Sequence, residues 1–292
     1  MNKKKWLFST IITVLTVVSL AACGSSSSNK SSSTSTDKLA QIKKSGKLTV
    51  GTSPDFPPSE FYILNDKGEK EIVGSDISLA KAIAKEIGVK LDIKATDFNG
   101  VLANIQTGSV DIGISGFVGT DERKKIMDFS DGYEQEVSDG YQGILTTKEV
   151  AQKYTTLADL KKAKLKVGSQ SGSIQYELAT AITSAANIKQ YGTMDAAVLA
   201  LNSGDIDAVT VSTTSVEPLL TSFPNLTLLS KEEFNLDPKN KYATNVIGIP
   251  KDDANKSLIK LINKVIKENK DNGNLKKWKD EATEQAKKAI NE

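Results

Sequence analysis

The sequence lacks histidine altogether and has a single cysteine, Cys23, in 292 residues. Without histidine, histidine-dependent catalytic triads and the usual zinc sites are excluded, and one cysteine excludes an internal disulfide. Aromatic residues make up only 6% of the chain and the formal net charge is +2, so no surface for stacking or attracting nucleic acid is indicated. We therefore expect no nucleic-acid partner, no metal and no cofactor.

The first 22 residues have the pattern of a secretory signal peptide. Lysines at positions 3–5 precede an apolar run over 6–20, which is short for a transmembrane helix and ends in the tetrad LAAC. This tetrad resembles a bacterial lipobox, in which the cysteine, here Cys23, is acylated with palmitate-type chains. Residues 23–37 are rich in serine and predict a lipidated, flexible tether. The expected location is the extracellular face of a Gram-positive cell membrane.

The remainder of the chain alternates short β-branched runs with amphipathic helical patterns, which is typical of an α/β fold with parallel sheets. Apolar residues at helical spacing, such as Ile77, Ala80 and Ile83, are interpreted as core packing. Strands are predicted at residues 48–51, 90–94, 111–115, 143–146, 165–168, 208–212, 226–229 and 246–249.

Two segments of the first half recur in the second half in the same order. LAQIKKSGKLTVGTS at 39–53 returns as LADLKKAKLKVGSQ, and VLANIQTGSVDIGIS returns as AVLALNSGDIDAVTVS. In each copy of the second segment a helix is predicted to end at a glycine, Gly108 or Gly204, and an aspartate, Asp111 or Asp207, opens the next strand. The repeat predicts two lobes of similar build. Because ligands bind at the carboxyl ends of strands in open sheets, facing lobes also predict a cleft.

Arg123 lies in SGFVGTDERKKIMDFSD, directly after one of these predicted strand ends. A run of three basic residues most often faces water, which is one interpretation of Arg123 with Lys124 and Lys125. The other is that the guanidinium of Arg123 pairs with a ligand carboxylate in a fork that lysine does not provide. The position beside the predicted cleft favours the second interpretation.

Several segments together resemble the extracellular solute-binding proteins of polar amino-acid ABC transporters, family 3, of the glutamine and lysine/arginine/ornithine type. They are GTSPDFPPSEF, IVGSDISLAKAIAKEIG, DFNGVLANIQTGSVDIGISG, TDERKKIMDFSDGY and NGNLKKWKDE. The resemblance covers nearly everything after the tether. It implies a type II periplasmic-binding-protein fold of two Rossmann-like lobes joined by two hinge strands, with 38–141 and 245–292 forming lobe one and 142–244 forming lobe two.

The resemblance implies a receptor, not an enzyme, that captures a small amino-acid-like solute and delivers it to ABC permease subunits. A tethered monomer is the default expectation. Phe56 and Phe98 match aromatic residues that sandwich the ligand, and Arg123 matches the partner of the α-carboxylate, helped by backbone N–H groups near Gly116 and Ser173. The implied ligand-binding positions are Asp55, Phe56, Phe98, Ser115, Gly116, Arg123, Gly172, Ser173, Gln175 and Ser212.

The sequence departs from the family pattern at the place that holds the ligand's α-ammonium group. Ser212 replaces the expected aspartate, and Ser53 replaces an aspartate of the first loop. An ammonium group without a counter-ion is costly to bury. Either Asp55 or another carboxylate, such as Glu217, therefore supplies the negative charge, or the ligand is a derivative or small peptide without a free α-amine. Two further hydroxyl positions are apolar here, Val118 and Ile174.

Two other classes of protein are consistent with the same scaffold. A dehydratase acting on cyclic carboxylic acids would need a poised general acid or base, and no paired-carboxylate motif stands out in the sequence. An adhesin or sensory ectodomain would use the lobes as an interaction surface, and adhesion as a secondary role is compatible with a receptor.

Overall fold

The computed structural model describes residues 37–135 and 140–289. The predicted signal peptide, the lipidation site Cys23 and nearly all of the tether lie outside these residues, so those predictions stay predictions. Within the described ranges, no helix combines the length and the apolar character that crossing a membrane requires.

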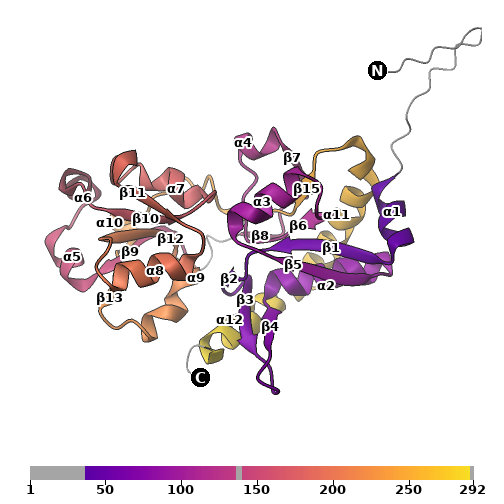
Figure 1. Ribbon diagram of the computed structural model, residues 1–292, viewed down its shortest axis with the longest axis horizontal. Helices are drawn as coiled ribbons and strands as arrows, with labels where there is room; N and C mark the ends of the chain where they lie inside the picture. The colour runs from indigo at the N-terminus through magenta and orange to yellow at the C-terminus, as the bar shows by residue number, and fades with distance from the viewer. Residues whose placement is uncertain (1–36, 136–139, 290–292) are drawn as a thin grey trace, which may run out of the picture. The chain divides into compact units, whose positions relative to one another are not determined.

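The first sheet has the strand order β5-β1-β6-β15-β7. Its strands are β5 (Lys90–Ala95), β1 (Lys47–Thr52), β6 (Ile112–Gly113), β15 (Gly248–Pro250) and β7 (Met127–Phe129). The helices around it are α1 (Lys38–Ser45), α2 (Ser75–Ile87), α3 (Phe98–Gln106), α4 (Asp121–Lys124) and α11 (Lys256–Asp271) (Figure 1). The apolar faces of α1, α2 and α11 share one core with β1, whereas Val101 and Ile105 of α3 belong to a second core beneath the ligand-side loops.

The second sheet has the order β11-β10-β12-β9-β13. Its strands are β11 (Ile188–Tyr191), β10 (Val167–Gln170), β12 (Ala208–Ser212), β9 (Gln142–Thr147) and β13 (Leu226–Leu228). The helices that accompany it are α5 (Lys148–Lys153), α6 (Leu157–Ala163), α7 (Ile174–Ala179), α8 (Met194–Asn202), α9 (Thr213–Val216) and α10 (Lys231–Phe234). Two buried clusters, one containing Val198 of α8 and the other Leu160 of α6, form its core.

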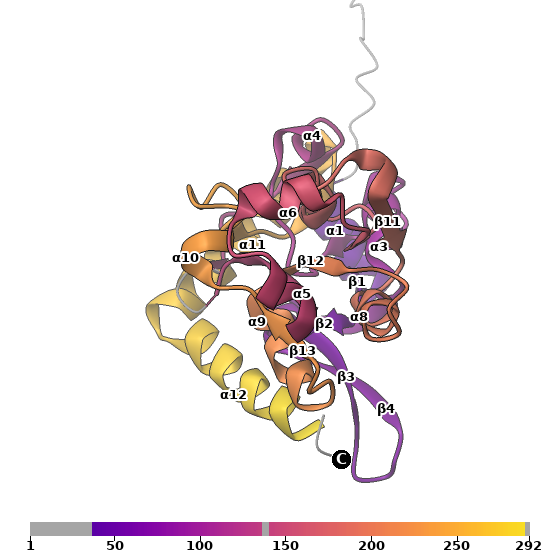
Figure 2. The same cartoon turned by 90° about the vertical axis from the view of Figure 1, so that its left-hand side faces the viewer.

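Smaller elements complete the chain. They are the antiparallel sheet β2 (Asp55–Phe56), β3 (Glu60–Leu64) and β4 (Lys70–Val73), the paired crossing strands β8 (Glu134–Gln135) and β14 (Thr244–Asn245), the 3-10 turns Ala185–Asn187, Glu217–Thr221 and Asp253–Asn255, and α12 (Asn274–Ala289). Helix α12 buries Ala282 and Ala286 against Phe61 of β3, and Figure 2 shows it beside this small sheet.

The predicted two-lobed α/β architecture is confirmed, with one difference in strand direction. Each large sheet contains a strand that runs antiparallel to its neighbours, β9 in one and β15 in the other. Both strands follow a crossing strand, β8 or β14, instead of a helical crossover. A chain that arrives from the other lobe enters the sheet from the side on which the crossing strand ends. It therefore runs opposite to the strands that helices connect. The exact residue limits of the two lobes stay a prediction.

The internal repeat has a clear structural counterpart. The Asp111 carboxylate accepts a hydrogen bond from the backbone N–H of Thr49 at 2.8 Å, and Asp207 accepts one from the N–H of Lys166 at the same distance. Each aspartate thus fixes the start of the neighbouring strand in its own lobe. The helices before them, α3 and α8, end at Gln106 and Asn202, and the glycines two residues later, Gly108 and Gly204, have positive φ values of 70° and 82°.

Candidate functional site

A cavity of about 30 Å³ lies where the strand ends of the two sheets face each other. Eight of the ten predicted ligand-binding residues line it, namely Asp55, Phe56, Phe98, Ser115, Gly116, Arg123, Ser173 and Gln175. From the first lobe come the loop after β6 and the start of α3, and from the second lobe come the end of β10 and the first turn of α7. The repeat therefore places equivalent loops on opposite walls of one cavity.

Arg123 is buried in the cavity wall although its neighbours Lys124 and Lys125 are exposed. Its Nη1 donates to the carbonyl oxygen of Val118 at 2.8 Å, and its Nη2 donates across the cleft to the carbonyl oxygen of Gly172 at 2.9 Å. Burial lowers the pKa of Arg123 to about 10, so the guanidinium keeps its charge at neutral pH. A buried cation whose hydrogen-bond acceptors among the described residues are two backbone carbonyl oxygens is suited to bind an anion.

Two phenylalanine rings lie against this cation, and a third lines the same cavity. The Cζ atom of Arg123 lies 5.3 Å from the ring centroid of Phe98 and 5.9 Å from that of Phe117, and the two rings meet edge to face at 6.2 Å. The ring of Phe56 packs against Gly116, where an added Cβ would lie 2.9 Å from it. The aromatic rings keep the guanidinium group in its orientation and provide apolar surface for a ligand.

The two apolar departures from the family pattern lie together. Val118 of the first lobe and Ile174 of the second belong to one small buried cluster with Tyr242. They form an apolar wall beside Arg123 that spans both lobes. Water is thereby excluded next to the cation, which strengthens its interaction with a bound carboxylate.

Asp55 joins the lobes directly. Its Oδ2 accepts hydrogen bonds from Gln170 Nε2 and from the backbone N–H of Met194, both at 2.8 Å, while its Oδ1 accepts from Ser53 at 2.8 Å. Met194 is the first residue of α8, so an aspartate of one lobe lies at the positive end of a helix of the other. Burial raises the pKa of Asp55 above its ordinary value, and these donors oppose that shift.

We expect the Asp55→Ala variant to populate more open conformations than the wild-type protein when no ligand is added. Loss of charge-assisted hydrogen bonds costs about 1.5–3 kcal/mol, enough to change the ratio of closed to open molecules about tenfold or more. Small-angle X-ray scattering would show a larger radius of gyration. Asp252→Asn is the matched control, because Asp252 caps a turn within the first lobe. Identical scattering of Asp55→Ala and wild type would contradict the expectation.

The other predicted residues are placed differently. Gly172 does not line the cavity, but its carbonyl oxygen is the partner of Arg123. The N–H of Gly116 already donates to Asp76 at 2.9 Å, so in this conformation it points into the protein and not to a ligand. Ser212 is fully buried at the end of β12, within 3.1 Å of the Thr214 hydroxyl, and is not among the described residues that line the cavity.

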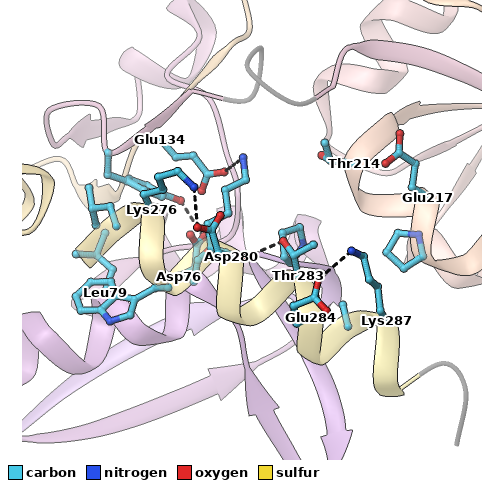
Figure 3. Close-up of a pocket in the computed structure, with 18 of the residues that line it drawn as sticks. Asp76, Leu79, Glu134, Thr214, Glu217, Lys276, Asp280, Thr283, Glu284 and Lys287 are labelled. Carbon is cyan, nitrogen blue, oxygen red and sulfur yellow. Dashed lines mark hydrogen bonds and ion pairs between the residues drawn. The ribbon is translucent and has the colours of Figure 1, made fainter. Parts of the chain in front are cut away.

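Glu217, the alternative carboxylate for an ammonium group, lies elsewhere. It lines a separate hollow of about 1180 Å³ on the side of α12 and the crossing strands. Figure 3 shows Glu217 and Thr214 on a segment that faces α12, away from Asp76 on the opposite wall. Of the two carboxylates that the sequence offered, the structure brings Asp55 alone to the cavity.

Sequence reasoning missed several lining residues, of which Glu60 is the most informative. The cavity also contains Phe117, Gln142 and Gln170. Glu60 begins β3, is fully buried and accepts a hydrogen bond from Ser115 at 2.8 Å. The only signal for it was an acidic residue at the start of an apolar strand, a pattern that occurs often on surfaces. Paired carboxylates do exist here, contrary to the impression from the sequence: Glu60 and Asp76 of α2 are both fully buried, and burial together with the Asp76 carboxylate raises the pKa of Glu60.

Two α/β lobes that close over a cavity with a buried arginine define a two-lobed solute-binding protein. Residues 48–284 match the profile of the bacterial extracellular solute-binding proteins, family 3, and the chain belongs to this family. It is 33% identical over 239 residues to the arginine-binding extracellular protein ArtP of Bacillus subtilis (strain 168), covering 80% of this chain and 84% of the relative. The L-cystine-binding protein TcyJ of Escherichia coli (strain K12) is 26% identical over 249 residues, 82% of this chain and 85% of that protein.

Solved structures agree with the fold. The amino acid ABC transporter substrate-binding protein AbpA of Streptococcus pneumoniae, bound to L-arginine, has a TM-score of 0.75 and 33% identity, covering 85% of this chain and 98% of its own. An ancestral amino acid-binding protein described as a precursor of cyclohexadienyl dehydratase has a TM-score of 0.70 and 31% identity, covering 84% of this chain and 99% of its own.

Proposed function

We propose that this protein is the extracellular substrate-binding component of an ABC importer and that it captures an amino acid in the cavity between its lobes. The observation that carries the proposal is the buried Arg123 guanidinium, whose present partners are two backbone carbonyl groups. A ligand α-carboxylate would replace the Gly172 carbonyl and accept two parallel hydrogen bonds. The family and its structural relatives, among them proteins bound to L-arginine, support this assignment.

The charges of the cavity favour an amino acid with a cationic side chain, and we propose arginine as the first candidate. The lining contains one guanidinium group, that of Arg123, and two carboxyl groups, those of Asp55 and Glu60. A zwitterion with a further positive charge matches one guanidinium and two carboxyl groups better than a neutral amino acid does. Asp55 would then take the role of the aspartate that Ser212 replaces.

Ligand entry requires the lobes to move apart. A cavity of about 30 Å³ is far smaller than the ~300–1,000 Å³ typical of ligand pockets. The contacts of Arg123 with Gly172 and of Asp55 with Gln170 span the cleft and have to open first. Because the ligand then contacts both lobes, its binding energy favours the closed form, which is the form that a permease distinguishes.

We further propose that Cys23 carries the lipid anchor and that a monomer on the extracellular side of a Gram-positive membrane passes its ligand to permease subunits. The family description supports an extracellular protein. The LAAC tetrad supports acylation of Cys23. We also propose that the protein binds its ligand without catalysing a reaction.

Isothermal titration calorimetry with a panel of amino acids tests the ligand. We expect arginine to bind most tightly, lysine and ornithine more weakly, and glutamine or N-acetylarginine weakest, because each of the last two lacks one positive charge. Tight binding of N-acetylarginine would favour the alternative of a ligand without a free α-amine. Mass spectrometry of the ligand recovered after incubation tests whether the protein catalyses a reaction. Conversion of the ligand to a product would support the dehydratase alternative instead.

A further inference from the structure

The carboxyl groups of Glu60 and Asp76 form a buried pair between the ligand cavity and the hollow beside α12. Both residues are 0% exposed. Glu60 lines the ligand cavity, whereas Asp76, in the first turn of α2, lines the hollow that Figure 3 shows. The ion pairs of the described residues include neither of them; Glu134, which acts on Asp76, pairs with Lys279 at 2.8 Å. Two adjacent anions without a cation would be strongly unfavourable in this place.

The hydrogen bonds around the pair have one consistent arrangement. Ser115 donates its hydroxyl to Oε1 of Glu60 at 2.8 Å, so this oxygen is an acceptor. The Tyr133 hydroxyl and the Gly116 N–H both donate to Oδ2 of Asp76, at 2.8 and 2.9 Å. The remaining oxygens, Oε2 of Glu60 and Oδ1 of Asp76, receive nothing from any N–H or O–H group of the described residues.

The two carboxyl groups are neighbours, because the backbone N–H of Asp76 donates to the carbonyl oxygen of Ser59, the residue before Glu60, at 2.9 Å. A buried pair of carboxyl groups without a cation is stabilised by one shared proton, and the two donors to Asp76 make it the better carboxylate. The proton therefore belongs on Oε2 of Glu60, an oxygen to which none of the described residues donates.

The titratable surroundings agree with this assignment. Burial and the adjacent Asp76 carboxylate raise the pKa of Glu60 well above its ordinary value, and burial raises the pKa of Asp76 to about 6. The groups around the pair are Asp55 of β2, Tyr133, Glu134 of the crossing strand β8 and Lys279 of α12, which pairs with Glu134. Arg123 lines the same cavity as Glu60. Both shifts favour the pair that holds one proton and one negative charge over the pair with two negative charges.

We infer that Glu60 is a neutral carboxylic acid before the ligand binds and gives up its proton when a cationic amino acid enters the cavity. This inference rests on the proposed function. The O–H bond of Glu60 breaks, the electron pair stays on the Glu60 carboxylate, and the proton passes to the buffer. The cation of the ligand replaces the proton beside Glu60, so the charge buried in the cavity wall stays balanced. A neutral ligand would leave the proton in place.

Calorimetry in two buffers measures this exchange directly. At pH 7, arginine is titrated into the protein in phosphate and in Tris, whose heats of ionisation differ. Release of about one proton for each arginine bound makes the observed enthalpy differ between the buffers by the corresponding amount. Equal enthalpies in the two buffers would overturn the inference even if arginine binds tightly.

Two controls identify the source of the proton. In Glu60→Gln the amide can donate to Asp76 and accept from Ser115, so it imitates the protonated acid and should preserve the fold. We expect this variant to bind arginine at least tenfold more weakly and to release no proton. With wild-type protein, glutamine should bind without a buffer effect. A buffer effect that persists in Glu60→Gln would assign the proton to another group and overturn the inference.

Infrared spectroscopy tests the proton without any ligand. The wild-type protein should show the carbonyl stretch of a buried protonated carboxylic acid, and Glu60→Gln should lack it. Absence of this band in the wild type would overturn the inference. If instead no cationic amino acid binds, the proposed function fails while the infrared result still decides the state of Glu60.

Discussion

The Arg123→Ala variant is expected to lose at least a hundredfold in affinity for arginine. A ligand carboxylate in this cavity is desolvated between aromatic rings and the apolar wall of Val118 and Ile174. Removal of the guanidinium would leave that carboxylate buried and unpaired, which costs about 3–5 kcal/mol, or a factor of roughly 10² to 4 × 10³ in Kd. Isothermal titration calorimetry with arginine provides the measurement.

Two further variants distinguish the contributions of the charge of Arg123, of its planar geometry and of the neighbouring lysines. Arg123→Lys keeps a positive charge but not the planar fork, so we expect an intermediate loss. Lys124→Ala removes an exposed neighbour whose amine lies 3.0 Å from Asp121, and it should bind arginine as the wild type does. Thermal unfolding followed by circular dichroism checks that each variant is folded. If Arg123→Ala and Lys124→Ala bound arginine equally well, Arg123 would be only one more charge of the basic run.

The fold could be predicted from the sequence because its signals are local or repeated. The strand spacing, the glycines at 108 and 204, and the aspartates that follow them occur twice, and each copy folds by contacts within its own lobe. The reversed direction of β9 and β15 could not be predicted in this way. It depends on the chain crossing between lobes, a long-range connection that no strand pattern records.

The candidate site was only partly predictable for the same reason. Arg123 and Phe98 lie at strand or helix ends that the motifs locate, so their burial in a cleft follows from the repeat. The partners of Asp55 in the other lobe, by contrast, are 115 and 139 residues away in the sequence. Glu60 and Asp76 belong to different elements and become a pair only when β3 packs beside α2. Neither the pairing of two carboxyl groups nor the capping of a helix by a residue of the other lobe leaves a periodic pattern in the sequence.

Gly74 controls how β3 and α2 meet, and the Gly74→Ala variant is expected to lose about 3 kcal/mol or more of its free energy of unfolding. Gly74 has φ 132° and ψ 173°, a conformation that is almost restricted to glycine and costs other residues about 1–3 kcal/mol. A Cβ atom there would lie 2.0 Å from the Ser59 carbonyl oxygen and 2.9 Å from the Glu60 nitrogen. Overpacking of this kind adds about 1–3 kcal/mol.

The displaced backbone is the one that holds the carboxyl pair, so Gly74→Ala should change the site as well as the stability. The N–H of Asp76 donates to the Ser59 carbonyl at 2.9 Å, the same oxygen that the new methyl group would strike. Gly68→Ala is the matched control, because Gly68 also has positive φ, 75°, but no atom lies within 4 Å of its added Cβ. Backbone strain alone should cost that variant about 1 kcal/mol. Urea unfolding followed by circular dichroism measures both losses, and equal values would show that strain at positive φ, and not the contact with Ser59, determines the effect at Gly74.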